Sequence, residues 1–530
     1  MGLYGWIDGL RRRGLRGTLG GLDRRRRPAS PGAYLARRQR RRFLALLAAS
    51  AGLALLLAGG ALYLHRTSSR PVSGSPSIVV LPFANLSGDP GQDYFADGMT
   101  EEIQGALSEI PGLRVMGRTT TFALRGRTQD AREVGRKLGV TSILEGSVRR
   151  IGSRLRVTAK VVDARDGYQL WSETFDREAG DILAVQDEIG RAVAMSLQVT
   201  LLPSRLPGHA AQTVDPEVYN QYLLARRFLA PSSLDGFVRA VAASEKAISL
   251  APGFAPAWAT LSTAFSGLAD YAQDPDEIAL NQRKGVAAAA RAIDLDPRLA
   301  EAYAARAQLL AQTSWDWESA REDFDHALAL APGDADILRK KGAWLLAPQG
   351  RVTEAIEVLR RSTELDPLSA SAWMSLGLLE VAATRGRAGE GSLLRATEIA
   401  PDNDYALQAL GVRELLVGNP AGALARTNRC SPGVWRLRGA ALAEHDLGHA
   451  REAEAALAEL TGELASPSPF QIAEVHAWRG EADQAFAWLE KALLARDGGL
   501  LLLTWDPLLA KIRGDARMAS LLRRMNLDPR

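Results

Sequence analysis

The chain has 530 residues, of which 46% are hydrophobic and 24% are charged. This length exceeds what one hydrophobic core serves, so several domains or a repeat array are expected, and the composition argues against wholesale disorder. The single cysteine, Cys430, excludes a framework of intramolecular disulfides.

The net charge of +4 conceals an uneven distribution along the chain. Residues 1–42 carry 13 arginines against only Asp8 and Asp23, so the rest of the chain is net acidic. This basic leader shows no apolar periodicity and is predicted to be disordered. Its arginines are expected to contact anionic lipid, because neither a helix-turn-helix nor interleaved aromatic residues accompany the charge; a nucleic-acid partner is disfavoured.

Residues 43–64 form an uncharged stretch of 22 residues, FLALLAASAGLALLLAGGALYL, which is long enough to cross a membrane as a helix. Arginines crowd its N-terminal edge, so the positive-inside rule places residues 1–42 in the cytoplasm and the bulk of the chain outside. A cleaved twin-arginine export signal is the alternative, since Arg41 and Arg42 precede Phe43. The apolar run is long for a signal, which favours a membrane span. Residues 65–76 read as a linker rich in Ser, Pro and Gly.

Residues 77–202 are predicted to form a small α/β domain. Phe95, Met99, Ile103 and Leu107 recur every four residues and indicate one apolar face of a helix that ends near Pro111. The remaining expected elements are strands over 77–86, 114–119, 143–150, 155–163 and 169–175 and helices over 131–138 and 181–202.

The segment 79–103 runs from a strand through a loop rich in Gly and Asp into an acidic helix start. A phosphate-binding loop would need a glycine-framed run that ends in Lys-Ser/Thr, and no such run is present. Carboxylates could bind a hard cation, but the EF-hand spacing is absent. The favoured interpretation is architectural: a turn at Asp89-Pro90-Gly91, followed by acids at the positive end of a helix. These acids are Asp93, Asp97, Glu101 and Glu102.

Four stretches of this region resemble the TolB amino-terminal-like domain of membrane-bound bacterial regulators and repeat proteins. They read SIVVLPFANLSGDPGQDYFADGMTEEI, LRVMGRTTTFALRG, VGRKLGVTSILEGSVRRIGSRLRVTAKVVDARDGYQLWSETFDRE and DILAVQDEI. The resemblance implies a module placed between an N-terminal output domain, such as a nucleotide cyclase or a winged-helix DNA binder, and C-terminal tetratricopeptide repeats. In this chain the output position holds only the basic leader and the predicted span.

A period governs the chain beyond residue 216. Prolines end successive helix-like runs at spacings of 45, 35, 35 and 34 residues, close to the tetratricopeptide period of ~34; they are Pro252, Pro297, Pro332, Pro367 and Pro401. The long first spacing predicts a longer inter-helix turn at residues 271–276. The repeats are expected over 216–497, and a C-terminal cap over 498–530 with a helix at 515–525.

Small residues at fixed repeat positions are expected to let paired helices approach, and stacking buries what one unit alone exposes. Trp315, Trp317 and Trp344 are therefore predicted to pack in the array rather than to bind a ligand. The resemblance to tetratricopeptide proteins implies that the concave surface, formed by the first helix of each pair, receives peptides.

Signatures of catalysis are missing from the sequence. The six histidines include no HExxH pattern and no cysteine partner for zinc, and no GxSxG or kinase motif is present. His445 and His449 have a ligand-capable spacing on a predicted helix, but no third ligand is evident, and Cys430 lacks a recognisable histidine partner. We therefore expect no catalytic, cofactor-binding or metal-binding residues and no cofactor.

The fold class expected from the sequence is a small α/β domain plus an all-α tetratricopeptide solenoid, with one N-terminal transmembrane helix. The expected function is that of a non-enzymatic scaffold or adaptor at the bacterial inner membrane, which binds proteins in the periplasm. Two alternatives stay open: a signal transducer without a recognisable output domain, and an enzyme with an unrecognised site in the α/β domain. The sequence does not specify the partner, its binding residues or the oligomeric state.

Overall fold

The computed structural model describes residues 76–126, 130–197, 199, 214–272, 274–462, 464–465 and 468–528, all within one compact unit. The predicted leader and the predicted span at 43–64 lie outside these residues. Among the helices that the structure describes, none is both long enough and apolar enough to cross a membrane.

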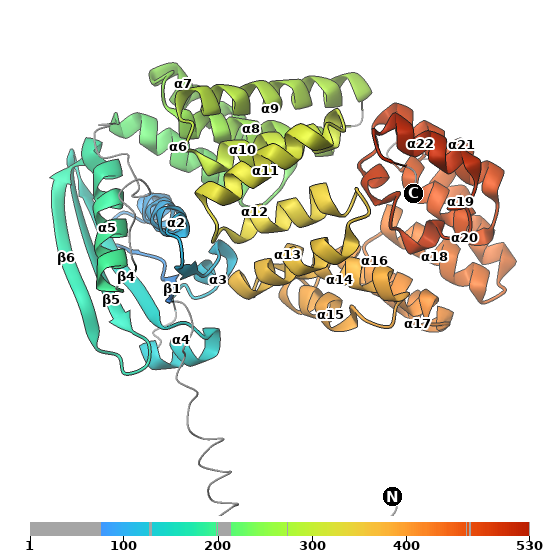
Figure 1. Cartoon of the computed structure of the whole chain (residues 1–530), viewed down its shortest axis with the longest axis horizontal. Helices are drawn as coiled ribbons and strands as arrows, with labels where there is room; N and C mark the ends of the chain where they lie inside the picture. Colours follow the sequence, from blue (N-terminus) through green and yellow to red (C-terminus); the bar gives the residue numbers. More distant parts are fainter. Residues whose placement is uncertain are drawn as a thin grey trace, which may run out of the picture. The chain divides into compact units, whose positions relative to one another are not determined.

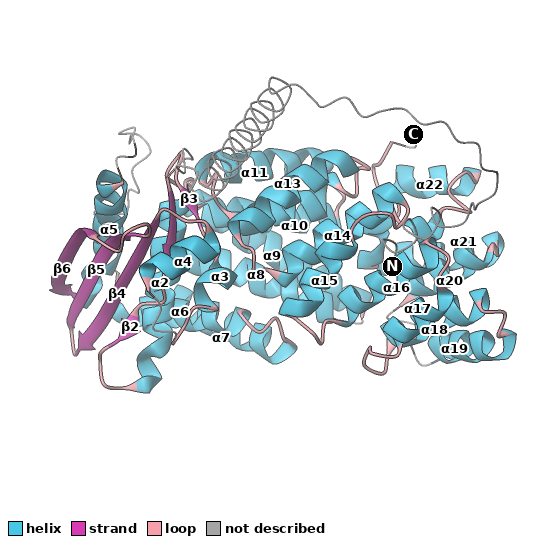
Figure 2. Ribbon diagram, turned by 90° about the horizontal axis from the view of Figure 1, so that it is seen from below, coloured by secondary structure: helices cyan, strands magenta, loops and turns pink. Residues whose placement is uncertain are grey.

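The α/β part is built on a mixed sheet with the strand order β3-β1-β4-β5-β6, while β2 pairs with β4. β1 runs parallel to both of its neighbours. β4, β5 and β6 form an antiparallel meander (Figure 2). The strands are β1 (Ser77–Val80), β2 (Ala84–Asn85), β3 (Arg114–Val115), β4 (Ser142–Ile151), β5 (Arg154–Asp163) and β6 (Gln169–Glu178).

Alternation along β1 divides the α/β core into two faces. Ile78 and Val80 pack in a core with α2 (Asp93–Ser108) and α5 (Ile182–Ser196), whereas Val79 packs on the other face with α4 (Ala131–Leu138). The predicted apolar face of α2 is confirmed, because its four periodic residues are all buried. The predicted helix at 131–138 is confirmed as well.

Two predicted strands are shorter than the sequence indicated. The strand expected over 77–86 breaks after Val80, because Pro82 has no N–H to donate and the amide of Phe83 donates instead to Thr100 Oγ1 on α2, at 3.0 Å. The strand expected over 114–119 ends at Val115, and a short helix α3 (Arg118–Phe122) follows it.

The remaining described residues form a tetratricopeptide-like solenoid of eight helix pairs, which confirms the repeat array (Figure 1). Each of the five periodic prolines follows the second helix of a pair, as predicted. The pairs are α6 (Pro216–Leu229) with α7 (Leu234–Leu250), α8 (Ala255–Tyr271) with α9 (Pro275–Leu295), α10 (Ala300–Thr313) with α11 (Trp317–Leu330), α12 (Ala335–Lys340, extended by a π-helical segment Lys341–Leu346) with α13 (Val352–Leu365), α14 (Ala370–Thr384) with α15 (Glu390–Ile399), α16 (Asp404–Leu416) with α17 (Pro420–Thr427), α18 (Val434–Asp446) with α19 (Ala450–Gly462), and α20 (Pro469–Arg479) with α21 (Ala482–Ala495).

The predicted cause of the long first spacing is wrong. α8 and α9 are separated only by residues 272–274, but they contain 17 and 21 residues, whereas α10 and α11 contain 14 each. The alanine-rich stretch within α9 favours helix over turn, so the extra residues lengthen the helices.

Glycines at equivalent positions allow close contact between the two helices of a pair. A Cβ atom on Gly342 would lie 2.8 Å from Leu359 Cγ, and one on Gly377 would lie 2.7 Å from Leu393 Cγ. A larger residue at either position would push the paired helices apart. The predicted role of small residues in stacking is therefore confirmed in these two pairs.

The C-terminal residues fold back onto earlier repeats, and we call this the closing contact. Helix α22 (Ala516–Arg524) and the residues after it share a core with α10 and α11, in which Trp315 and Trp317 are buried. Trp317 Nε1 donates to the carbonyl of Met525 at 2.8 Å, and Thr504 Oγ1 donates to the carbonyl of Pro348 at 3.0 Å. The predicted packing role of these two tryptophans and the predicted capping helix are confirmed.

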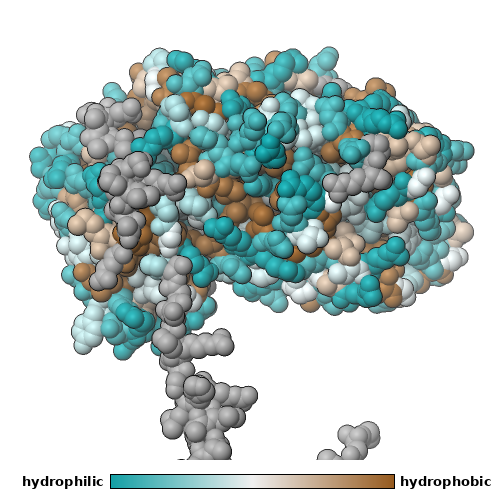
Figure 3. All heavy atoms as spheres, in the orientation of Figure 1, coloured by the Kyte–Doolittle hydropathy of each residue, from teal (hydrophilic) through white to brown (hydrophobic). Residues whose placement is uncertain are grey.

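Hydrophilic residues cover most of the face drawn in Figure 3, and hydrophobic residues show in a hollow near its middle. The solvent-facing side of the meander is likewise polar: Arg156 pairs with Asp176 at 2.6 Å, and Lys160 pairs with Glu145 at 2.7 Å. An antiparallel sheet with one face on the core and one in water commonly has this pattern.

Candidate functional site

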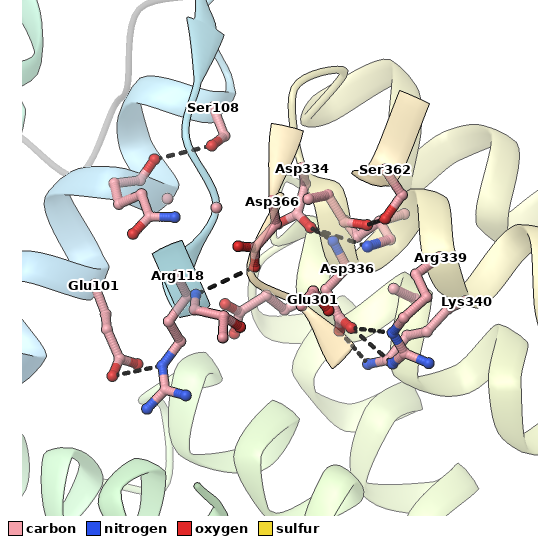
Figure 4. A pocket seen from close by; sticks show the side chains of 18 of the residues that line it. Glu101, Ser108, Arg118, Glu301, Asp334, Asp336, Arg339, Lys340, Ser362 and Asp366 are labelled. Atoms are coloured by element: carbon pink, nitrogen blue, oxygen red, sulfur yellow. Dashed lines mark hydrogen bonds and ion pairs between the residues drawn. The ribbon is translucent and has the colours of Figure 1, made fainter. Parts of the chain in front are cut away.

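A polar pocket of about 420 Å³ lies where the α/β part meets the repeats (Figure 4). Helices α2 and α3 form one side. Helices α6, α8, α10, α12 and α14, the first helices of five successive pairs, form most of the rest, together with Ser362 of α13 and residues of the adjoining loops. This volume is typical of sites that bind small molecules or short segments of a partner.

The contact between α2 and α6 fixes the first wall of the pocket. Val218, Tyr219 and Tyr222 of α6 are buried in the core of the α/β part. A Cβ on Gly98 would lie 2.4 Å from Leu223 Cδ2, so only glycine permits this approach of the two helices. The first repeat helix thus belongs to both parts of the fold.

An ion-pair network joins this wall to the third repeat. Arg226 on α6 pairs with Glu101 at 3.3 Å, with Glu102 at 3.4 Å and with Glu301 on α10 at 3.0 Å. Burial alone would lower the pKa of Arg226, but the carboxylates around it hold that pKa well above its ordinary value. Burial raises the pKa of Glu102, whose Oε1 accepts a hydrogen bond from Tyr222 at 2.6 Å.

A second contact joins α3 to the loop after α13. Asp366 accepts hydrogen bonds from the amides of Thr119 at 3.1 Å and Thr120 at 2.9 Å, and from Thr120 Oγ1 at 2.7 Å. A Cβ on Gly117 would lie 2.3 Å from Asp366 Cβ. Asp296, which also precedes a repeat proline, accepts from the nearby Arg298 amide at 2.9 Å instead. Asp366 therefore caps a helix of the α/β part from within the repeats.

The wall opposite α2 is the N-terminal end of α12. Asp334 accepts from the amides of Asp336 at 2.8 Å and Ile337 at 2.9 Å. Asp336 pairs with Arg339 at 2.7 Å and with Lys340 at 3.1 Å (Figure 4). Burial, with a further contribution from Asp336, raises the pKa of Asp334 to about 6.

The acids predicted at the 79–103 junction divide into two groups. Asp89 accepts from the Gly91 amide at 2.8 Å in the predicted turn, and Asp93 lies in the first turn of α2. Glu101 and Glu102 lie too far along α2 for the helix dipole to act on them, so that part of the interpretation is wrong. They belong to the pocket and its arginine network instead, and Asp97 pairs with Arg125.

His445 and His449 do not share a helix, contrary to the prediction, because α18 ends at Asp446. His449 Nδ1 lies 2.7 Å from Glu444 Oε2. Across the described ranges, no three His, Cys, Asp or Glu side chains are arranged to hold a metal. Cys430 is buried, and burial raises the pKa of its thiol.

Four residues of the pocket had no local signal in the sequence: Gln104, Arg226, Glu301 and Asp366. Arg226 and Glu301 lie on first helices of repeats, the face expected to receive a partner, but no motif singles them out. Asp366 and Asp296 share the same local sequence, Leu-Asp-Pro, although their side chains have different partners.

Comparison with known proteins gives limited relationships. No family model matches the chain. It is 43% identical over 188 residues to a protein of Rhizobium meliloti (strain 1021) named "Putative adenylate cyclase 3". The match covers 35% of this chain and 32% of that protein, so the chain spans about a third of the relative's length.

Similar solved structures share low identity with the chain. The type IV pilus biogenesis factor PilW is 20% identical, with a TM-score of 0.34, and covers 40% of this chain and 96% of its own. YrrB, a TPR protein with a peptide-binding site, is 18% identical, with a TM-score of 0.27, and covers 40% and 96%. Yeast Tom70 is 17% identical, with a TM-score of 0.36, and covers 58% and 67%. The fold described above rests on the helix pairs themselves and not on these likenesses.

Proposed function

We propose that this chain is a non-enzymatic, membrane-anchored scaffold that binds a segment of a partner protein. The observation that carries the proposal is the pocket, because the first helices of five successive repeats face it together with α2 and α3. A surface shared by consecutive repeats suits an extended segment that contacts one unit after another.

The anchoring is proposed from residues 43–64 and the arginines before them. The leader would contact anionic lipid in the cytoplasm, and the α/β part and repeats would lie in the periplasm of a bacterium. The assignment of residues 77–202 to the TolB amino-terminal-like domain rests on the four motif stretches. A mixed sheet flanked by helices is compatible with that assignment.

The anchoring predicts the activity of reporter fusions. Alkaline phosphatase, which requires the periplasm, is expected to be active when fused after residue 75 and inactive when fused before residue 43. The reason is that Arg37, Arg38, Arg40, Arg41 and Arg42 retain the N-terminal side in the cytoplasm. A cytoplasm-active reporter at the same two positions is the control. The reverse pattern would contradict the proposed topology.

Blocking the pocket is expected to abolish partner capture. Ser371 is exposed on α14 and lines the pocket, so Ser371→Trp should reduce recovery of a partner at least tenfold, because the indole fills the space that a segment needs. The measurement is crosslinking and mass spectrometry with the full-length chain in intact cells.

Ser249→Trp is the matched control, since Ser249 is exposed on α7, the second helix of its pair, and does not line the pocket. Both variants should have the same melting temperature as the parent chain, measured by circular dichroism. If the partner is still recovered with Ser371→Trp, or if its recovery falls equally with Ser249→Trp, the pocket is not the binding surface.

A regulatory role is the second candidate, and the 43% identity to the protein named as an adenylate cyclase favours it. In this role the chain would share a sensing or binding segment with that protein. Incubation of the purified chain with ATP and Mg²⁺ tests whether the similarity extends to the activity in that protein's name. Formation of cyclic AMP would contradict the proposal that the chain is non-enzymatic.

A further inference from the structure

The pocket presents carboxylates to solvent and covers most of its cations. Its lining holds five acidic side chains, Glu101, Glu301, Asp334, Asp336 and Asp366, and four basic ones, Arg118, Arg226, Arg339 and Lys340. The side chains of Asp336 and Glu301 are 57% and 49% exposed, whereas those of Arg226, Arg339 and Lys340 are 16–20% exposed. A ligand therefore meets acidic groups on the walls formed by α10 and α12.

An unsatisfied acceptor lies on the opposite wall. Gln104 of α2 is 9% exposed and lines the pocket, and its Oε1 is buried without a hydrogen-bond partner among the described residues. A buried acceptor of this kind costs about 1–3 kcal/mol unless a donor reaches it. A half turn of the terminal amide exchanges its oxygen and nitrogen, and an oxygen turned toward the pocket would accept from an N–H group of a ligand there.

Arg118 adds a donor to the same wall. Its Nε pairs with Glu101 Oε1 at 2.7 Å, and its side chain is 46% exposed. A guanidinium has five N–H groups in a planar fork, so Arg118 can pair with Glu101 and also donate to a carbonyl oxygen. Gln104 and Arg118 together offer one acceptor and one donor, which is what one peptide unit requires.

The lining disfavours nucleotides and nucleic acids. It contains no aromatic side chain on which a base could stack, and its carboxylates outnumber its cations.

We propose that this pocket recognises a lysine or arginine side chain within an extended segment of the partner protein. The basic side chain lies between Glu301 and Asp336, while Gln104 accepts a backbone N–H of the segment and Arg118 donates to a backbone carbonyl. This inference rests on the proposed function, since it specifies what the scaffold binds. It requires no change in the covalent structure of either molecule.

The test uses the purified full-length chain and positional-scanning mixtures of labelled nonapeptides. The central residue is fixed as Lys, Arg, norleucine or Glu, and the other positions are randomised. We expect at least tenfold enrichment of Lys- and Arg-centred peptides over the norleucine- and Glu-centred ones. The neutral double variant Glu301→Gln/Asp336→Asn should abolish that preference, because both carboxylates lose their charge while their size is kept.

Two further variants guard against effects on folding. Glu318→Gln is the matched control, because Glu318 is an exposed acid on α11 that pairs with Arg321 outside the pocket. Glu301→Lys should shift the preference toward Glu-centred peptides, a gain that misfolding does not produce. Preference for basic peptides in the double variant, or no shift with Glu301→Lys, would overturn the inference.

The outcomes separate this inference from the proposed function. If Ser371→Trp blocks capture in cells but the peptides show no basic preference, the basic-residue inference is wrong and the scaffold stands. If free L-lysine, L-arginine or spermidine competes as strongly as the basic peptides do, the pocket binds a small amine and the peptide inference is overturned. If neither peptides nor a partner bind, both proposals fail.

Discussion

Replacing Phe324 with alanine is expected to lower the free energy of unfolding by about 3–5 kcal/mol. Phe324 is completely buried on α11, in the core that the third repeat shares with the C-terminal residues. Removing its ring leaves a cavity against two parts of the array at once, so the surrounding helices cannot collapse easily to fill it. Urea unfolding followed by helical circular dichroism measures the loss.

Glu322→Ala is the control for the Phe324 experiment, because Glu322 is exposed on the same helix. Its effect should stay within about 0.5 kcal/mol. Phe324→Leu leaves a smaller void, so its loss of unfolding free energy should lie between those of Glu322→Ala and Phe324→Ala. An effect of Phe324→Ala no larger than that of Glu322→Ala would mean that this core does not support the array.

Replacing Glu474 with alanine is expected to cost about 3–5 kcal/mol, because it leaves a buried arginine without its carboxylate. Arg438 on α18 and Glu474 on α20 are almost completely buried, and Nη1 of the arginine lies 3.1 Å from Oε2 of the glutamate. The guanidinium also lies over the Trp435 ring, at 5.3 Å from its centroid. The measurement is again urea unfolding, at a pH above the raised pKa of Glu474.

Two variants isolate the charge of this pair. Glu474→Gln keeps the size and an oxygen acceptor but removes the negative charge, so the difference between its cost and that of Glu474→Ala measures what the acceptor contributes. Arg438→Met/Glu474→Leu replaces both charges with apolar groups and should cost less than Glu474→Ala, since no buried charge is left alone. A loss below about 1 kcal/mol for Glu474→Ala would contradict the importance of the pair.

The same residue sets a dependence of stability on pH. Burial, and then the neighbouring Arg438 and Asp506 with opposing effects, leave the pKa of Glu474 well above its ordinary value of 4.5. The unfolded chain therefore releases this proton near pH 4.5, and the folded chain releases it only at a higher pH, where the carboxylate that pairs with Arg438 forms. The contribution of Glu474 to stability falls as the pH rises between these two pKa values. Glu474→Gln should lack this contribution to the dependence of the unfolding free energy on pH.

Local pattern was sufficient to predict much of the fold. The period of four in Phe95, Met99, Ile103 and Leu107 located α2, and the spacing of the prolines located the ends of the repeat pairs. The first signal arises because buried residues recur with the period of the helix, and the second arises because a proline follows the second helix of each of these pairs. The strands of the meander, β4, β5 and β6, lie close to the predicted ranges 143–150, 155–163 and 169–175.

Two of the failures depended on contacts between distant residues. The run Thr119–Thr121 favours a strand by propensity, but Asp366, 246 positions from Thr120, caps it as a helix. The pocket was not predictable either, because its lining comes from residues between Glu101 and Ser371, on separate helices. The residues next to Gln104 in the sequence give no sign that its Oε1 lacks a hydrogen-bond partner among the described residues.

The closing contact changes how this array can come apart. A linear repeat protein unfolds unit by unit from a free end, because each unit depends only on its neighbours. Here Trp317 and Met525, 208 positions apart, are joined, so the third repeat and the C-terminal helix support each other. The last six helix pairs should therefore melt as one cooperative block with no frayed end. Such long-range closure raises the contact order, which slows folding.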